Sequence, residues 1–262
     1  MMIMIYFFNF FQMAHLETSK ILEPELTVQK FEFPADVNRF QNPFTMLLAG
    51  PTMCGKSTFI LEVLKNRNEL LRTKYSQIVY RVPATDLHSE IRQQYITKLT
   101  QVIPDIIIKT GLPEPRDFMI NNLPKLFILD DLMKPLFENR EMETFFTNEA
   151  HGWNTSIIYT LQNYFPLKKD LTIVRQTCYK VIFNDVSDKT YLSTISQRIS
   201  GKSNFLKECF LKLKKTSPDQ RYNYIMVDSH PGSDLTHRHL FIKTNIFPGK
   251  DQKIRPLFFI AL

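Results

Sequence analysis

A short run of glycine, lysine and hydroxyl residues has the spacing that a phosphate-binding loop needs. It follows an apolar run and matches G-x-x-x-x-G-K-[ST], with Gly50, Gly55, Lys56 and Ser57 at the fixed positions. Glycines let such a loop aim its backbone N–H groups at phosphate, the lysine reaches the outer phosphates, and the hydroxyl binds Mg²⁺. A glycine turn before an ordinary helix is the alternative. The pattern predicts a nucleoside triphosphate site formed by Gly50, Pro51, Thr52, Met53, Cys54, Gly55, Lys56, Ser57 and Thr58.

Two aspartates at the end of a second apolar run could supply the carboxylates of this metal site. Residues 125–131 read KLFILDD, which ends in Asp130 and Asp131. A buried parallel strand reads as a continuous apolar run, and ligands of open α/β sheets lie beyond the carboxyl ends of the strands. We therefore expect Asp130 to hold Mg²⁺ through water and Asp131 to orient or deprotonate the attacking water. The alternative is an acidic turn that caps a helix beginning at Leu132, because Asp is also a favoured N-cap residue.

The apolar pattern predicts the sheet that would bring these segments together. Helical spacing indicates helices at 58–71, 87–99, 189–199 and 204–215, while 103–123, with its prolines, should form a loop or a short strand. Strands are expected at 44–49, 77–82, 126–129, 156–161, 180–183 and 222–227. This alternation predicts an α/β fold with a mostly parallel central sheet covered by helices on both faces. We expect a leader and extended arm at 1–41, one domain at 42–250 and a C-terminal tail at 251–262.

Composition and charge indicate which kinds of partner and which cellular compartment suit this chain. The 262 residues carry 33 Lys and Arg against 26 Asp and Glu, a net charge of +7 that suits phosphate backbones or anionic surfaces. Three widely spaced cysteines, Cys54, Cys178 and Cys209, indicate neither a disulfide framework nor a zinc cluster and favour a reducing compartment. The apolar residues 1–11 are too short to cross a bilayer and lack the features of a secretory signal, so we expect no stable membrane insertion. Met13 is then a candidate start, and a membrane-surface anchor is the alternative.

Several motifs together resemble one family. In chain order they read LLAGPTMCGKST, LFILDDLM, SIIYTLQNYFP, YKVIFND, YNYIMVD and TNIFP. The series resembles the packaging ATPases of the FtsK/HerA superfamily, specifically the poxvirus-type group of large DNA viruses and of Polinton/Maverick and adintovirus-like elements, over about 40–249. The resemblance implies a RecA-like P-loop NTPase that binds ATP and Mg²⁺, forms a homo-oligomeric ring and drives double-stranded DNA into a capsid. It also implies capsid or portal partners, and a place in the cytoplasm or nucleus of a host cell or in the virion.

The resemblance assigns roles to individual residues. Lys56 and Ser57 match the Walker A lysine and Mg²⁺ ligand, and Asp130 matches the Walker B metal carboxylate. Asp131 stands where the superfamily places its catalytic acid, usually a glutamate, and Gln162 matches a polar sensor that can respond to the γ-phosphate. The alternative for Gln162 is an ordinary amide at the end of a strand.

The chain also departs from the family. Met53 and Cys54 stand where relatives commonly have Gly-Ser. Relatives often carry an arginine just before the glutamine strand, where this chain reads AHGWN. A ring motor needs an arginine finger from a neighbouring subunit, and none of the candidates matches well: Arg140, Arg175 and Arg198. A weakened, nucleotide-binding remnant or assembly module therefore remains an alternative. A GTP-dependent switch is less favoured, because the segment nearest to N-K-x-D, at 184–187, lacks the lysine and the final aspartate.

Two further groups of residues are candidates for binding. Five lysines could contact DNA phosphates, although a solvated helix face is the favoured interpretation: Lys202, Lys207, Lys212, Lys214 and Lys215. The histidines at 230, 237 and 239 lack cysteine partners and a fixed zinc spacing, so no metal site is predicted there.

Overall fold

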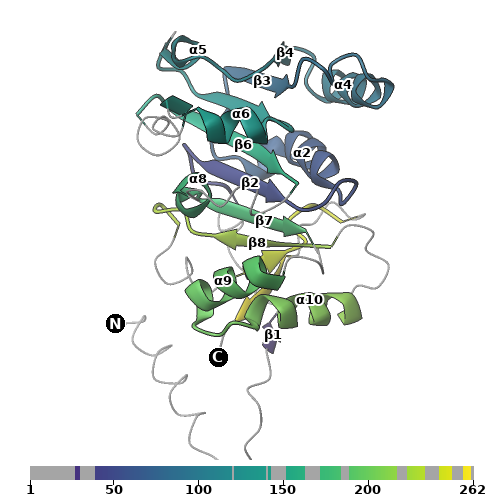
Figure 1. The fold of residues 1–262 in the computed structure, drawn as a ribbon, viewed down its shortest axis with the longest axis vertical. Helices are drawn as coiled ribbons and strands as arrows, with labels where there is room; N and C mark the ends of the chain where they lie inside the picture. The colour runs from purple at the N-terminus through teal and green to yellow at the C-terminus, as the bar shows by residue number, and fades with distance from the viewer. Residues whose placement is uncertain are drawn as a thin grey trace, which may run out of the picture.

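The computed structural model describes residues 27–29, 39–119, 121–139, 141–142, 152–162, 172–183, 189–216, 223–233, 242–249 and 256–260. Within this part of the chain, ten strands form one sheet in the order β1-β10-β9-β8-β7-β2-β6-β5-β3-β4 (Figure 1). The strands are β1 (Thr27–Gln29), β2 (Thr45–Ala49), β3 (Gln77–Val82), β4 (Ile107–Thr110), β5 (Lys125–Leu129), β6 (Thr155–Leu161), β7 (Tyr179–Phe183), β8 (Tyr224–Asp228), β9 (Ile242–Thr244) and β10 (Leu257–Ile260). The six strands from β7 to β4 are parallel, while β8, β9, β10 and β1 extend one edge with antiparallel pairings.

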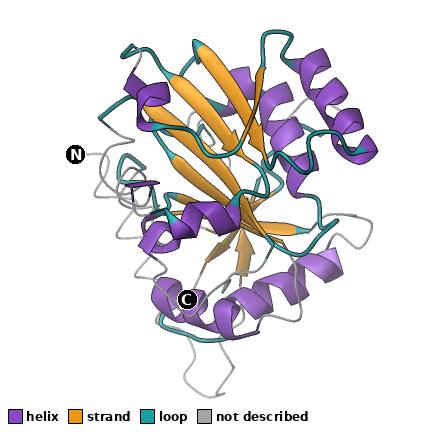
Figure 2. Ribbon diagram, turned by 45° about the horizontal axis from the view of Figure 1, so that its top comes forward, coloured by secondary structure: helices purple, strands orange, loops and turns teal. Residues whose placement is uncertain are grey.

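Helices cover both faces of this sheet (Figure 2). They are α2 (Lys56–Lys65), α3 (Arg67–Leu70), α4 (Glu90–Val102), α5 (Pro115–Met119), α6 (Met133–Glu138), α8 (Thr172–Gln176), α9 (Lys189–Ser200) and α10 (Phe205–Thr216). Alternate residues of a strand point to opposite faces. In β2, Met46 and Leu48 pack in a core with α2, α3 and α4, whereas Leu47 and Ala49 pack in a second core with α5, α6, α8, α9 and α10. The predicted α/β fold with a mostly parallel, doubly covered sheet is confirmed.

Local capping explains where the helices differ from the expected ranges. The helix expected at 58–71 is interrupted at Asn66, whose side-chain Nδ2 donates to the Glu62 carbonyl at 2.8 Å and so satisfies the last turn of α2. The helix expected at 87–99 begins at Glu90, because the Ser89 side chain caps it by accepting from the Arg92 N–H. Between Ile103 and Leu123 the chain forms both a strand, β4, and a short helix, α5.

The edge of the sheet extends beyond the predicted domain. β1 lies in the expected arm and β10 in the expected tail, yet the two strands pair with each other, and β10 also pairs with β9. These strands have only three or four residues each, which is too short for a periodic pattern to identify them. Among the described residues, no helix has the length and apolar character needed to cross a bilayer.

Candidate nucleotide-binding site

The loop between β2 and α2 is tied to the sheet and turns through left-handed backbone positions. The Gly50 N–H donates to the Leu161 carbonyl at 3.1 Å, which fixes the loop to the end of β6. A side chain at Gly50 would place its Cβ 2.8 Å from Phe183 Cβ, so this position requires glycine. Met53 and Gly55 have φ values of 65° and 109°, the region where glycine is favoured.

Lys56 begins α2 and lies inside the loop. Its side chain is only 8% exposed, and its Nζ donates to the carbonyls of Gly50 and Pro51 at 2.7 and 2.8 Å. The sulfur of Cys54 lies 3.9 Å from the same ammonium. The ammonium group of Lys56 therefore lies at the N-terminus of a ten-residue helix. Backbone N–H groups and the helix dipole favour an anion at the same place.

The sheet register brings the aspartates to the edge where this loop lies. β6 runs between β2 and β5, pairing Leu161 with Ala49 and Tyr159 with Leu129, so the three parallel strands end together. Asp130 follows β5 and is 2% exposed.

Asp130 is held by donors from three elements. Its carboxylate accepts from Tyr80 Oη on β3 at 2.7 Å, from Thr160 Oγ1 on β6 at 2.9 Å, and from Arg92 on α4. Burial and the Asp130 charge raise the pKa of Tyr80 well above its ordinary value, so this hydroxyl stays protonated and donates.

Asp131 turns back toward β6. It has a left-handed φ of 57°, and its N–H donates to Thr160 Oγ1 at 2.9 Å. Its Oδ1 accepts from Gln162 Nε2 at 3.2 Å, which brings the predicted sensor into contact with the predicted catalytic acid. Both side chains are accessible enough to meet solvent or a ligand, since Gln162 is exposed and Asp131 is 28% exposed.

Arg92 is the main residue of this site that the sequence patterns do not identify. Its guanidinium bridges the acidic pair, donating to Asp130 Oδ2 at 2.5 Å and to Asp131 Oδ2 at 3.0 Å. Burial disfavours its charge, but Asp130 and the other acidic neighbours outweigh burial and raise the pKa of Arg92 above its usual range.

The helix that carries Arg92 also contacts the loop. One turn further along α4, Tyr95 Oη donates to the Ser57 carbonyl at 2.8 Å. Arg92 and Tyr95 stand three residues apart, on one helix face. The three-residue spacing was the sequence signal that could have placed Arg92 beside Tyr95. In the sequence, however, Tyr95 reads only as part of the apolar face of a helix.

The donor set fits a magnesium nucleotide. Ser57 and Asp130 offer the hard oxygen ligands that Mg²⁺ prefers, and Lys56 with the loop N–H groups suits phosphate. An ionised carboxylate has about four acceptor sites. Tyr80, Thr160 and Arg92 each donate one hydrogen bond to the Asp130 carboxylate. Because these bonds leave about one acceptor site unused, the carboxylate can also accept from a water of a Mg²⁺ shell.

Other candidates are placed away from this edge or outside the described residues. Arg140, the segment 184–187, His237 and His239 lie outside them, and Arg175 and Arg198 are described only as backbone positions in α8 and α9. The His230 ring serves the fold, with Nε2 facing the Pro43 carbonyl at 2.9 Å and Nδ1 accepting from the Gly232 N–H at 2.9 Å.

The lysines of the α10 region lie opposite its buried face. Phe205, Leu206, Cys209, Phe210 and Leu213 pack in the core. Four of the five lysines are exposed and Lys212 is half-buried, an amphipathic arrangement in which the charged face meets solvent.

No protein-family model and no curated protein matches this chain. Among solved structures, the genome packaging NTPase B204 of Sulfolobus turreted icosahedral virus 2 in complex with sulfate is 13% identical, with a TM-score of 0.44 over 72% of this chain and 92% of that chain. The same NTPase in complex with ATP-gammaS is 12% identical, with a TM-score of 0.42 over 84% and 98%. The pCW3 conjugation coupling protein TcpA with ATPgS is 12% identical, with a TM-score of 0.39 over 73% and 62%.

Proposed function

We propose that this chain is a Mg²⁺-dependent ATPase that translocates double-stranded DNA and packages the genome of a virus or virus-like element. One observation carries the proposal: the loop at 50–58, the acidic pair and Gln162 meet at the same edge of the sheet, with Gln162 bonded to Asp131. A triphosphate in the loop would thus face both a metal carboxylate and a second acid.

Each residue has a role that follows from its position. Lys56 and the loop N–H groups bind the phosphates, and Ser57 and Asp130 hold Mg²⁺, which when bound neutralises phosphate charge. Asp131 orients the attacking water and accepts its proton. Gln162 shares a hydrogen bond with Asp131, so a change at the phosphate can pass to β6 through this contact.

The DNA substrate and the assembly are proposed from the resemblance and from charge. The glutamine strand and the later motifs resemble poxvirus-type packaging ATPases, and a net charge of +7 favours a polyanionic partner. A homo-oligomeric ring would supply an arginine finger from the neighbouring subunit. Capsid or portal proteins would be its partners, in the cytoplasm or nucleus of a host cell or in the virion.

ATP hydrolysis measured with and without duplex DNA tests this proposal. We expect Mg²⁺-dependent turnover that rises with duplex DNA at low salt and with protein concentration as subunits associate. Lys56→Ala and Asp131→Asn should each lower turnover at least about 100-fold, because each removes a charge that acts at the reacting phosphate. A wild-type protein that binds ATP but hydrolyses it at a rate indifferent to DNA would contradict translocation. GTP that outcompetes ATP would favour a switch protein.

A further inference from the structure

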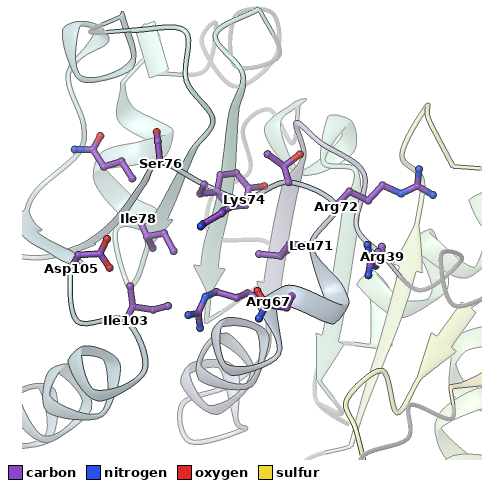
Figure 3. Close-up of a pocket in the computed structure, with 13 residues that line it drawn as sticks. Arg39, Arg67, Leu71, Arg72, Lys74, Ser76, Ile78, Ile103 and Asp105 are labelled. Atoms are coloured by element: carbon purple, nitrogen blue, oxygen red, sulfur yellow. The ribbon is translucent and has the colours of Figure 1, made fainter.

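A basic cavity lies at the end of the sheet opposite the nucleotide edge. It has a volume of about 530 Å³ and opens where β3 begins, between the turn after α3 and the turn after α4 (Figure 3). Four cationic side chains and a single carboxylate line it: Arg39, Arg67, Arg72, Lys74 and Asp105. Such an excess of cations around one cavity favours an anionic ligand.

The backbone that carries these cations is well anchored. Residues 40 and 71 form a parallel bridge, and the Phe40 N–H donates to the Leu70 carbonyl at 2.6 Å, which holds Arg39 beside the turn that carries Arg72. The Ser76 N–H donates to the Pro124 carbonyl at 2.9 Å and fixes the other end of this turn to the start of β5. The cations are therefore presented by a frame that is formed before a ligand arrives, which lowers the ordering cost of binding.

Arg67 and Lys74 occupy the middle of the cavity. Figure 3 shows both side chains between Ile103 and Asp105 on one side and Arg39 and Arg72 on the other. Arg67 is half-buried, and its Nη1 donates to the Leu64 carbonyl at 3.0 Å, which orients the planar guanidinium. Lys74 is exposed.

We propose that this cavity binds the phosphodiester backbone of duplex DNA, an inference that rests on the proposed function as a DNA motor. Guanidinium forks match the oxygens of a phosphate, and backbone contacts carry no sequence information, which suits a motor that must move any sequence. An acidic protein segment is the other occupant that the charge of the cavity would accept, and the binding test below distinguishes the two.

The position of the cavity has a mechanical consequence. The nucleotide edge lies at the carboxyl ends of β2, β5 and β6, whereas the cavity lies at the amino end of β3, beyond α2 and α3. DNA held there does not compete with ATP for space. α2 runs from Lys56 in the loop to Lys65, and α3, which begins at Arg67, follows after the single residue Asn66, so this helical segment reaches both sites.

Duplex binding by charge variants across a salt series tests the inference. Arg67→Gln/Lys74→Gln should weaken binding of a labelled duplex at least 10-fold and reduce the slope of log K against log [salt] by about 2, because each lost phosphate contact removes about 0.9. Lys74→Glu changes one exposed side chain and should weaken binding further than Lys74→Gln. Lys207→Gln/Lys214→Gln on α10 is the matched control and should leave the slope near that of wild type.

The outcomes separate this inference from the function on which it rests. If the wild-type protein binds duplex DNA and Arg67→Gln/Lys74→Gln binds it with the same affinity and salt slope, the cavity is not the DNA site. The motor proposal would still stand. Tighter binding of polyglutamate than of duplex DNA also overturns the cavity as a DNA site. Failure of the wild-type protein to bind duplex DNA at low salt contradicts both proposals. Retained binding of a fluorescent ATP analogue by the double variant confirms that it is folded.

Discussion

Asp130 combines nearly complete burial with hydrogen-bond donors from three different elements. Tyr80, Thr160 and Arg92 each donate to its carboxylate. A buried charge is tolerated only when it is paired and hydrogen-bonded, and these partners also fix the direction in which it points. The carboxyl group of Asp130 is thus fixed at a position where it can hold a metal.

Arg92→Ala should destabilise the protein strongly. It leaves Asp130 buried without its cation, which costs about 3 kcal/mol or more in the free energy of unfolding. Urea unfolding measures the loss. Lys98→Ala on the same helix is the control, because Lys98 is exposed and its removal should change stability by less than about 0.5 kcal/mol. Equal effects of the two substitutions would show that the ion pair contributes nothing.

At the scale of elements, the apolar strands β2, β3, β5, β6, β7 and β8 could be predicted from the sequence, whereas the short edge strands β1, β9 and β10 could not. Buried parallel strands such as β2 and β5 are continuous apolar runs, so their positions follow from composition alone. β1 and β10 are short, and each depends on a partner from the other end of the chain. The role of Arg92 was missed for a related reason: a charged residue on a helix normally faces solvent, and only the tertiary fold places this one on the acidic pair.

Some features of the candidate site could be predicted from the sequence and others could not. The loop and the acidic pair could be predicted because their spacing is fixed by local geometry: a glycine turn before a helix, and carboxylates directly after a strand. The contact between Gln162 and Asp131 needs β5 and β6 to be neighbours, which local pattern does not specify. Tyr80 reads as one more apolar residue of its strand, so its bond to Asp130 could not be expected.

Arg81 joins β3 to β4 and α5. Its guanidinium donates to the Leu112 carbonyl at 2.8 Å and to Asp117 Oδ2 at 2.5 Å. Burial alone would raise the pKa of Asp117, but the Glu114 N–H bond and the Arg81 charge prevail and lower it below its ordinary value. A carboxyl with a lowered pKa stabilises the fold above its unfolded pKa, and this contribution is lost as the pH falls through the folded pKa.

Asp117→Asn should therefore have a pH-dependent effect on stability. Near neutral pH it should lower the free energy of unfolding by about 2 kcal/mol, because a hydrogen bond to a charged group is lost. The difference from wild type should shrink as the pH falls below about 4, where the wild-type carboxyl becomes protonated. Urea midpoints of both proteins over this range give the comparison. A difference that does not change with pH would contradict the account of this ion pair.

At the scale of the whole molecule, the parallel sheet separates two charged sites. One edge carries the loop, the acidic pair and Gln162, and the opposite end carries the basic cavity. The helices α2 and α4 flank the nucleotide edge, and α4 contacts both the loop helix and the acidic pair. Under the proposed function, α4 is therefore the element that links the loop to the acidic pair, and motion of one part relative to the other would pass through it.

Calorimetric titration with ATPγS, in the presence and absence of Mg²⁺, tests the central claim most directly. We predict saturable binding to the wild-type protein that Mg²⁺ tightens. Lys56→Ala should weaken ATPγS binding at least about 10-fold in both conditions. Ser57→Ala should abolish only the gain in affinity that Mg²⁺ gives the wild-type protein. Equal affinity of wild type and Lys56→Ala, or wild-type binding that Mg²⁺ does not change, would contradict the assignment of this edge as a magnesium nucleotide site.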